Sequence, residues 1–216
     1  KNQFSKYAKE YKNHNIIQQI VAKSLVRELK FQPKRVLELG CGSGQVYNHI
    51  SWDLEFYKAI DFSSSMCELH PKGENIEVKC FDFDTQEFLD EIKDNSYDIV
   101  LSSSALQWSK DLSKIIKHLS FITKEINAVL FTSNTFKTIQ KITNTKSPIL
   151  DELSIKEAFS KYFTCEFETI MYKLEFDNKK DLFDYIKKSG VSGEASLDFK
   201  DAKKLYKEYN LNYLEF

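Results

Sequence analysis

A short apolar run that ends in alternating glycines constrains this chain more than any other feature. Residues 35–39 read Arg-Val-Leu-Glu-Leu and lead directly into glycines at 40, 42 and 44. An apolar run of this length between a proline and glycines is typical of a buried parallel strand that enters a tight turn. The residues from Gln45 to Ile50 predict the start of a helix. Because glycine permits positive φ and close approach of a ligand to the main chain, the strand, turn and helix together predict a nucleotide-sized cradle.

The spacing of the glycines excludes two common nucleotide-binding motifs. A dinucleotide fingerprint would place a glycine at 45 or 47, where Gln45 and Tyr47 stand, and the Gly-Lys-Ser/Thr of a Walker A loop is missing. The next apolar run, residues 56–60, instead ends in Asp61, seventeen positions beyond Gly44. A carboxylate at the tip of a second strand, about 20 residues past the glycines, is placed to bind a ribose diol.

The segment Glu38-Leu39-Gly40-Cys41-Gly42-Ser43-Gly44 together with Asp61 resembles motif I and the following acidic residue of class I S-adenosylmethionine (SAM) methyltransferases. A glycine turn with a purely structural role is the alternative. The resemblance implies SAM as cofactor and S-adenosylhomocysteine as product. It also implies a three-layer, Rossmann-like α/β fold: a mostly parallel central sheet with an antiparallel last strand, and helical segments before strand one and after strand five. The cofactor-binding residues that it implies are Glu38, Gly40, Cys41, Gly42, Gly44, Asp61, Phe62, Met66, Asp82, Phe83 and Ser103.

Composition limits the partners that we expect. The chain has 216 residues, with 31 basic and 32 acidic side chains, which suits one α/β domain and gives no electrostatic drive toward nucleic acid. No apolar stretch approaches the ~20 residues that span a bilayer, so we expect no membrane partner. No signal peptide is visible, and the four cysteines and four histidines lack metal-ligand spacing. We therefore expect a cytoplasmic protein without a metal site.

The first part of the chain alternates strand and helix patterns. Residues 1–31 predict an N-terminal helical cap, in which Ala22, Leu25, Val26 and Leu29 form an apolar stripe. Strands are predicted at 35–40, 55–61, 76–81, 97–101 and 126–131, with helices between them. This alternation predicts a doubly wound parallel sheet.

The pattern changes after Thr132. Residues 134–150 are polar and predict irregular structure, and the capping box of residues 154–157 predicts the start of a helix. A half-exposed strand is predicted at 170–176, helices at 179–189 and 199–209, and a closing edge strand at 211–216. We expect a single domain over residues 1–216, with residues 133–163 as a lid or insert.

A second resemblance concerns the methyl acceptor. Residues 104–108, Ser-Ala-Leu-Gln-Trp, with Asp111-Leu112 resemble the fourth motif of the malonyl-[acyl-carrier protein] O-methyltransferases of biotin synthesis. The spacing of Phe4, Tyr11 and His14 and the segment 182–193 are similar to that family too, whereas the region between 132 and 152 is shorter. The resemblance implies methyl transfer to the free carboxylate of a malonyl thioester. The implied acceptor-side residues are Tyr11, Gln107 and Trp108.

The chemistry of a carboxylate acceptor fits a chain that offers no convincing general base, because a carboxylate is already ionised at neutral pH. Two alternatives remain open on the sequence. One is a SAM-dependent methyltransferase for another small acceptor, such as a quinone precursor. The other is a non-catalytic binding protein with the SAM fold.

A lysine stripe on the last predicted helix suggests a carrier-protein partner. Lys200, Lys203, Lys204 and Lys207 share one face, and we expect Leu205, Tyr206 and Tyr209 to point toward the body of the protein. Since acyl-carrier protein is acidic, this face is a candidate docking surface. A simple solvated face is the alternative.

Overall fold

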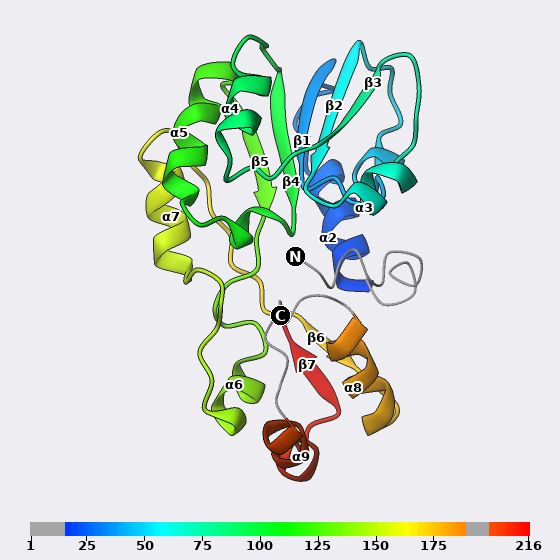
Figure 1. The fold of residues 1–216 in the computed structure, drawn as a ribbon, viewed down its shortest axis with the longest axis vertical. Coiled ribbons are helices and arrows are strands. Elements are labelled where there is room, and N and C mark those ends of the chain that lie inside the picture. The colour runs from blue at the N-terminus through cyan, green and yellow to red at the C-terminus, as the bar shows by residue number, and fades with distance from the viewer. Residues whose placement is uncertain (1–15, 189–198) are drawn as a thin grey trace.

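The computed structural model describes residues 16–188 and 199–216, and its centre is a five-stranded parallel sheet (Figure 1). The strands are β1 (Arg35–Leu39), β2 (Phe56–Asp61), β3 (Ile76–Cys80), β4 (Ile99–Ser103) and β5 (Ile126–Val129). Their order is β3-β2-β1-β4-β5, so the direction of winding reverses between β1 and β4. Ligands of open α/β sheets bind at such a reversal, outside the carboxyl ends of the strands. The expected α/β fold class is confirmed.

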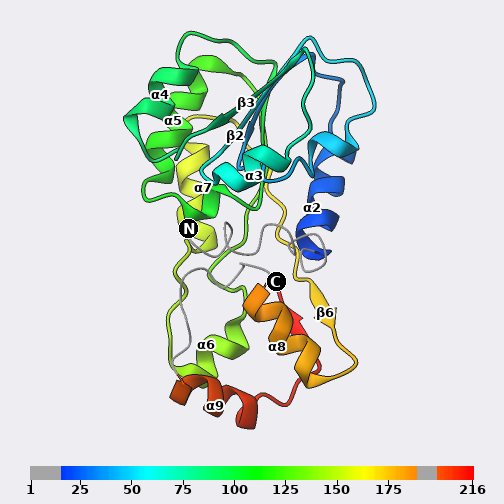
Figure 2. The same ribbon diagram turned by 45° about the vertical axis from the view of Figure 1, so that its right-hand side comes forward.

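Helices cover both faces of the sheet (Figure 2). One face carries α2 (Ile16–Arg27) and α3 (Ser64–Leu69), and the other carries α4 (Gln86–Ile92), α5 (Leu112–Ile122) and α7 (Glu152–Ser160). Alternation along β1 explains the two cores, because Leu37 and Leu39 pack with α4, α5 and α7, whereas Val36 packs with α2. Glu38 shares the face of Val36 and therefore lies on the α2 side of the sheet.

Two single turns stand where the chain leaves β1 and β4. The 3₁₀ turn η2 (Tyr47–His49) follows the glycines, and η3 (Leu106–Trp108) follows β4. The helix predicted from Gln45 is therefore wrong: the chain becomes extended at Ile50 after one turn. The glycine turn thus has no helix N-terminus behind it.

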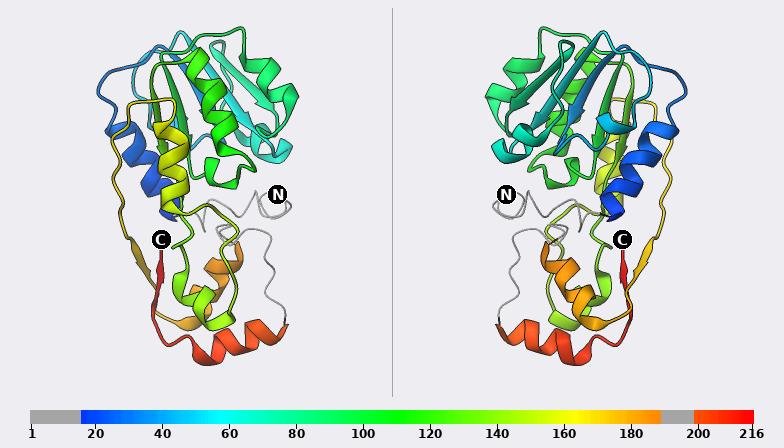
Figure 3. Two further views of the ribbon diagram at one scale, coloured as in Figure 1. Left: turned by 90° about the vertical axis from the view of Figure 1, so that its left-hand side faces the viewer. Right: turned by 90° about the vertical axis from the view of Figure 1, so that its right-hand side faces the viewer.

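A second group of elements packs below the carboxyl ends of the strands (Figure 3). It contains α6 (Lys137–Thr143), β6 (Lys173–Glu175), α8 (Lys179–Lys188), α9 (Phe199–Glu208) and β7 (Tyr213–Glu215). Strands β6 and β7 pair antiparallel in a sheet of their own. The antiparallel strand expected at the edge of the central sheet is thus found elsewhere, because Leu174 and Leu214 pack into the apolar cluster of this lower group.

Three local expectations need correction. Residues 134–150 are not wholly irregular, since they contain α6. The helix predicted from a capping box at 154–157 begins earlier, with Asp151 as its N-cap. Leu205 on α9 and Tyr209 just beyond it are buried as expected, but Tyr206 is 60% exposed and its ring contacts Phe183.

Some expectations fall outside the described residues or are not decided by the fold. The first half of the N-terminal cap and the turn at 189–193 are among the residues that the structure does not describe. The single domain over residues 1–216 with its cap and insert remains a prediction. Within residues 16–188 and 199–216, every helix is too short or too polar to cross a bilayer. Among these described residues, no three His, Cys, Asp or Glu side chains form a group that could hold a metal ion.

Candidate functional site

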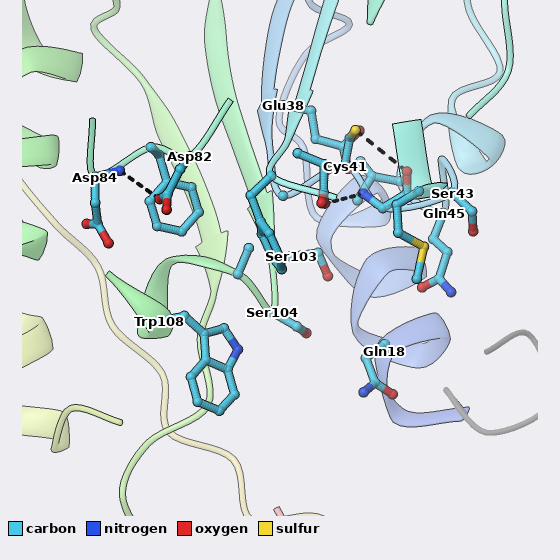
Figure 4. A pocket seen from close by; sticks show the side chains of 18 of the residues that line it. Gln18, Glu38, Cys41, Ser43, Gln45, Asp82, Asp84, Ser103, Ser104 and Trp108 are labelled. Carbon is cyan, nitrogen blue, oxygen red and sulfur yellow. Dashed lines mark hydrogen bonds between the residues drawn. The ribbon is translucent and has the colours of Figure 1, made fainter. Parts of the chain in front are cut away.

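A cavity of about 300 Å³ lies at the carboxyl ends of β1, β2, β3 and β4 (Figure 4). The backbone of residues 40–43 forms one wall, and the segments that follow β3 and β4 form the opposite wall. Of the predicted cofactor-binding residues, the cavity is lined by Glu38, Gly40, Cys41, Gly42, Asp61, Phe62, Met66, Asp82, Phe83 and Ser103. Gly44, the last glycine of the turn, is not among the lining residues.

The glycine turn has a conformation that other residues rarely adopt. Gly40, Gly42 and Gly44 have φ values of 74°, 51° and 87°. The amides of Gly40 and Cys41 donate to the carbonyl of Ile60 at 2.7 and 3.1 Å, which ties the turn to the end of β2. A Cβ atom on Gly40 would lie 2.0 Å from the Cβ of Ala105, whereas one on Gly42 would meet nothing within 4 Å. The turn is therefore clamped at Gly40 and open at Gly42.

Asp61 braces the glycine turn as well as lining the cavity. Its Oδ2 accepts a hydrogen bond from the amide of Gly42 at 2.9 Å, and its Oδ1 accepts one from the amide of Ser63 at 2.9 Å. Burial raises the pKa of Asp61, and the two backbone hydrogen bonds partly offset this effect. Carboxylate oxygens can accept several hydrogen bonds each, so these contacts leave capacity for the hydroxyl groups of a ligand.

The wall beyond β3 is held by two aspartates. Asp82 Oδ1 accepts from the amide of Asp84 at 3.1 Å. Asp84 Oδ1 in turn accepts from Ser109 Oγ and from the amide of Lys110, both at 3.0 Å. These bonds connect the loop after β3 to the loop after η3. Asp82 is half-buried and lines the cavity, so its carboxylate can meet a donor such as an exocyclic amine.

Two buried side chains at the glycine turn, those of Glu38 and Cys41, also line the cavity. Glu38 is buried, and its Oε2 accepts from the hydroxyl of Tyr57 at 2.6 Å. Burial is the main cause that raises the pKa of Glu38. A hydrogen bond with Cys67 raises the pKa of Cys41 well above its ordinary range, so Cys41 presents a neutral thiol to the cavity.

The predicted acceptor-side residues have three different outcomes. Trp108 lines the cavity and also packs against the lower apolar cluster. Gln107 is buried outside the lining, because its Nε2 donates to the carbonyl of Ser104 at 2.8 Å. It therefore braces Ser104, whose φ of 59° is strained, and its role toward an acceptor remains a prediction. Tyr11 lies outside the described residues.

Several lining residues were not predicted, among them Gln18, Asp84, Ser104 and Pro148. The sequence pattern could have identified Gln18. It stands four residues before Ala22, so it is a polar residue on the apolar stripe of α2. Ser104 also had a signal, because it directly follows β4 at the carboxyl end of a central strand. Pro148 had none, since only the folded loop brings it to the cavity.

Comparisons with known proteins agree with this geometry. Residues 37–129 match a family model described as a methyltransferase domain. The malonyl-[acyl-carrier protein] O-methyltransferase of Bacillus cereus is 27% identical over 164 residues, which cover 73% of this chain and 60% of that protein. The chain thus spans less than two thirds of the length of this relative.

Solved structures share the fold at low sequence identity. A chain in the complex between the Haloferax volcanii Trm112 methyltransferase activator and a methyltransferase superposes with a TM-score of 0.61 and 14% identity, over 99% of this chain and 94% of that one. The YcgJ protein of Bacillus subtilis superposes with a TM-score of 0.60 and 14% identity, over 86% and 81% of the two chains. The resemblance to methyltransferases that the glycine turn predicts is confirmed for residues 37–129.

Proposed function

We propose that this chain, which contains a methyltransferase domain over residues 37–129, transfers the methyl group of SAM to the free carboxylate of a malonyl thioester held on a carrier protein. The observation that carries the proposal is a single cavity that reaches both the glycine turn with Asp61 and, on its other side, Trp108. The substrate class is supported by the relatives named malonyl-[acyl-carrier protein] O-methyltransferase.

The residues of the cavity fit an adenosyl cofactor by their chemistry. Asp61 and Asp82 both line the cavity. Asp61 would accept from the ribose hydroxyls, and Asp82 would accept from the adenine amine. The open Cα face of Gly42 leaves room for a ligand against the main chain. Bound SAM supplies an electrophilic methyl group on a sulfonium.

The chain's contribution to the transfer would be alignment and exclusion of water. The titratable groups that line the cavity within the described residues are the Cys41 thiol and the carboxyl groups of Glu38, Asp61, Asp82 and Asp84. A carboxylate acceptor is ionised at neutral pH and needs no base from this set. Trp108 would hold the acceptor in line, since positioning of reactants supplies much of the rate in such displacements.

Methyl transfer itself tests the proposal. The protein is mixed with SAM labelled in its methyl group and with malonyl-acyl-carrier protein, and we expect label in a base-labile methyl ester. Trp108→Phe should raise the KM for the acceptor while S-adenosylhomocysteine still binds. Trp52→Phe is the matched control, because Trp52 lies outside the cavity with its Nε1 donating to the carbonyl of Pro33 at 2.8 Å. Absence of methyl ester with the wild-type protein would contradict the proposed acceptor.

The carrier protein would dock on the lysines of α9. Lys203, Lys204 and Lys207 are exposed on the side of this helix opposite the buried Leu205. Charge complementarity with an acidic carrier supports this surface. The double change Lys203→Glu with Lys204→Glu should slow methylation of the carrier-bound malonyl group and leave a small malonyl thioester unaffected. Equal rates with the carrier-bound substrate would rule out docking on α9.

A further inference from the structure

We propose that Glu38 and His70 share one proton beneath the glycine turn, and that binding of the cofactor releases this proton. The inference rests on the cofactor half of the proposed function and not on the identity of the acceptor. It assigns His70 a positioning role, since this residue lies outside the cavity lining.

The hydrogen bonds of His70 define which of its nitrogens carries a proton. The side chain is 2% exposed, and its Nδ1 lies 2.8 Å from the carbonyl oxygen of Pro71. Because a carbonyl only accepts, Nδ1 must be the donor. Nε2 has no hydrogen-bond partner among the described residues and lies 3.9 Å from Oε2 of Glu38. Without a further proton, a lone pair on Nε2 of His70 would face a lone pair on Oε2 of Glu38, with no hydrogen between them.

The surroundings of this pair are aromatic and nearly closed. Tyr57 donates to the same Oε2 of Glu38 at 2.6 Å. The rings of Tyr47 and Tyr57 lie 5.7 and 6.2 Å from the imidazole of His70. Burial raises the pKa of Tyr57 well above its ordinary range, so its hydroxyl stays protonated.

Few other titratable groups face the pair within the described residues. From β2 they are Tyr57 and Asp61, from η2 Tyr47, and from the glycine turn the Cys41 thiol. Asp61 is the one carboxyl group among them, and burial raises its pKa. A single proton between Glu38 and His70, written either as an ion pair or as a neutral pair, removes the repulsion between the lone pairs. The proton belongs to the pair, because interacting sites titrate together.

The pair is coupled to the cavity on two sides. Glu38 itself lines the cavity. A Cβ atom on Gly44 would lie 3.2 Å from Cδ2 and 3.3 Å from Nε2 of His70, so the imidazole packs directly under the glycine turn. The cofactor carries an ammonium group, and a cation bound in the cavity that Glu38 lines would favour the ionised carboxylate and disfavour a second positive charge on His70. The shared proton therefore leaves when the cofactor binds.

Calorimetry with S-adenosylhomocysteine measures this release without any methyl acceptor. Titrations of the wild-type protein at pH 6, 7 and 8, each in buffers of different ionisation enthalpy, give the number of protons released. We expect a release that approaches one proton, and an affinity that rises by up to about tenfold per pH unit over the range in which the pair is protonated.

Three variants locate the source of the proton. His70→Gln and Glu38→Gln each remove the shared site, so the observed enthalpy should no longer depend on the buffer. His49→Gln is the matched control, because His49 is exposed on η2 and should leave the release unchanged. Circular dichroism checks that each variant is folded.

The outcomes separate this inference from the proposed function. Binding of S-adenosylhomocysteine to the wild-type protein without proton release overturns the inference and leaves the function standing. Release that persists in both His70→Gln and Glu38→Gln also overturns it, since the proton then comes from another group such as Asp61. A wild-type protein that does not bind the ligand contradicts the cofactor site itself, and the inference with it.

Discussion

Each glycine of the turn at 40–44 meets a different neighbour, although all three have positive φ. Gly40 lies against Ala105 from the loop after β4, and Gly44 against Pro71 and His70. Gly42 alone faces open space, where its amide donates to Asp61. The missing side chain therefore allows close packing at Gly40 and Gly44, and it leaves open space at Gly42.

This difference predicts unequal effects of alanine on stability. Gly42→Ala should lower the free energy of unfolding by about 1 kcal/mol, the strain of a left-handed backbone. Gly40→Ala should lower it by about 3 kcal/mol or more, because a clash with Ala105 adds to the same strain. Urea unfolding of the two variants measures the difference. Equal losses would mean that Ala105 does not clamp the turn.

Sequence order predicts the position of candidate site residues that directly follow a strand. The glycines and Asp61 follow strands directly, so their positions at the strand ends could be inferred from order alone. The position of Gln107 depends on how the loop folds after β4, where its side chain donates to the carbonyl of Ser104. No pattern of residue types records such a bond.

At the scale of elements, the start of α7 shows how two adjacent capping signals compete. Ser154 begins a plausible capping box, but Asp151 Oδ1 accepts from the amide of Ser154 at 2.9 Å. The Ser154 hydroxyl donates to the other oxygen of the same carboxylate at 3.0 Å. The helix consequently begins at Glu152, two residues before the serine.

Substitution at the two positions distinguishes the two caps. Asp151→Ala should lower the urea midpoint, because it leaves amides of the first turn of α7 without their acceptor. Ser154→Ala should lower it less, since the amide of residue 154 keeps its bond to Asp151. A larger loss in Ser154→Ala would show that the helix begins at the serine in solution.

The strands of the central sheet could be predicted because each is an apolar run or, at β3, a run of alternating apolar and polar residues. The position of the antiparallel pair could not be predicted, because the residues of β6 and β7 do not indicate which sheet these strands join. Apolar contacts of Leu174 and Leu214 with the lower cluster decide this. The single turn η2 has the same local pattern of residue types as the start of a longer helix, so the sequence does not distinguish the two.

At the scale of the whole molecule, the cavity lies between the apolar cores of the central sheet and the apolar core of the lower group. The upper cores cover both faces of the parallel sheet, and the lower core joins α6, α8, α9 and β7 with Ile17 of α2 and Phe131 beyond β5 (Figure 1). Trp108 lines the cavity and packs against the lower core. The sheet thus carries the proposed cofactor wall, and the lower group backs the proposed acceptor side.

Binding of S-adenosylhomocysteine to the wild-type protein and to Asp61→Ala tests the central claim most directly. We predict one site in the wild-type protein and an affinity about 10- to 150-fold lower in Asp61→Ala, the effect of losing hydrogen bonds to a charged group. Asp94→Ala is the matched control, because Asp94 is exposed before β4, at the opposite end of the sheet. Failure of the wild-type protein to bind, or equal affinity in Asp61→Ala, would contradict the assignment of this cavity to an adenosyl cofactor.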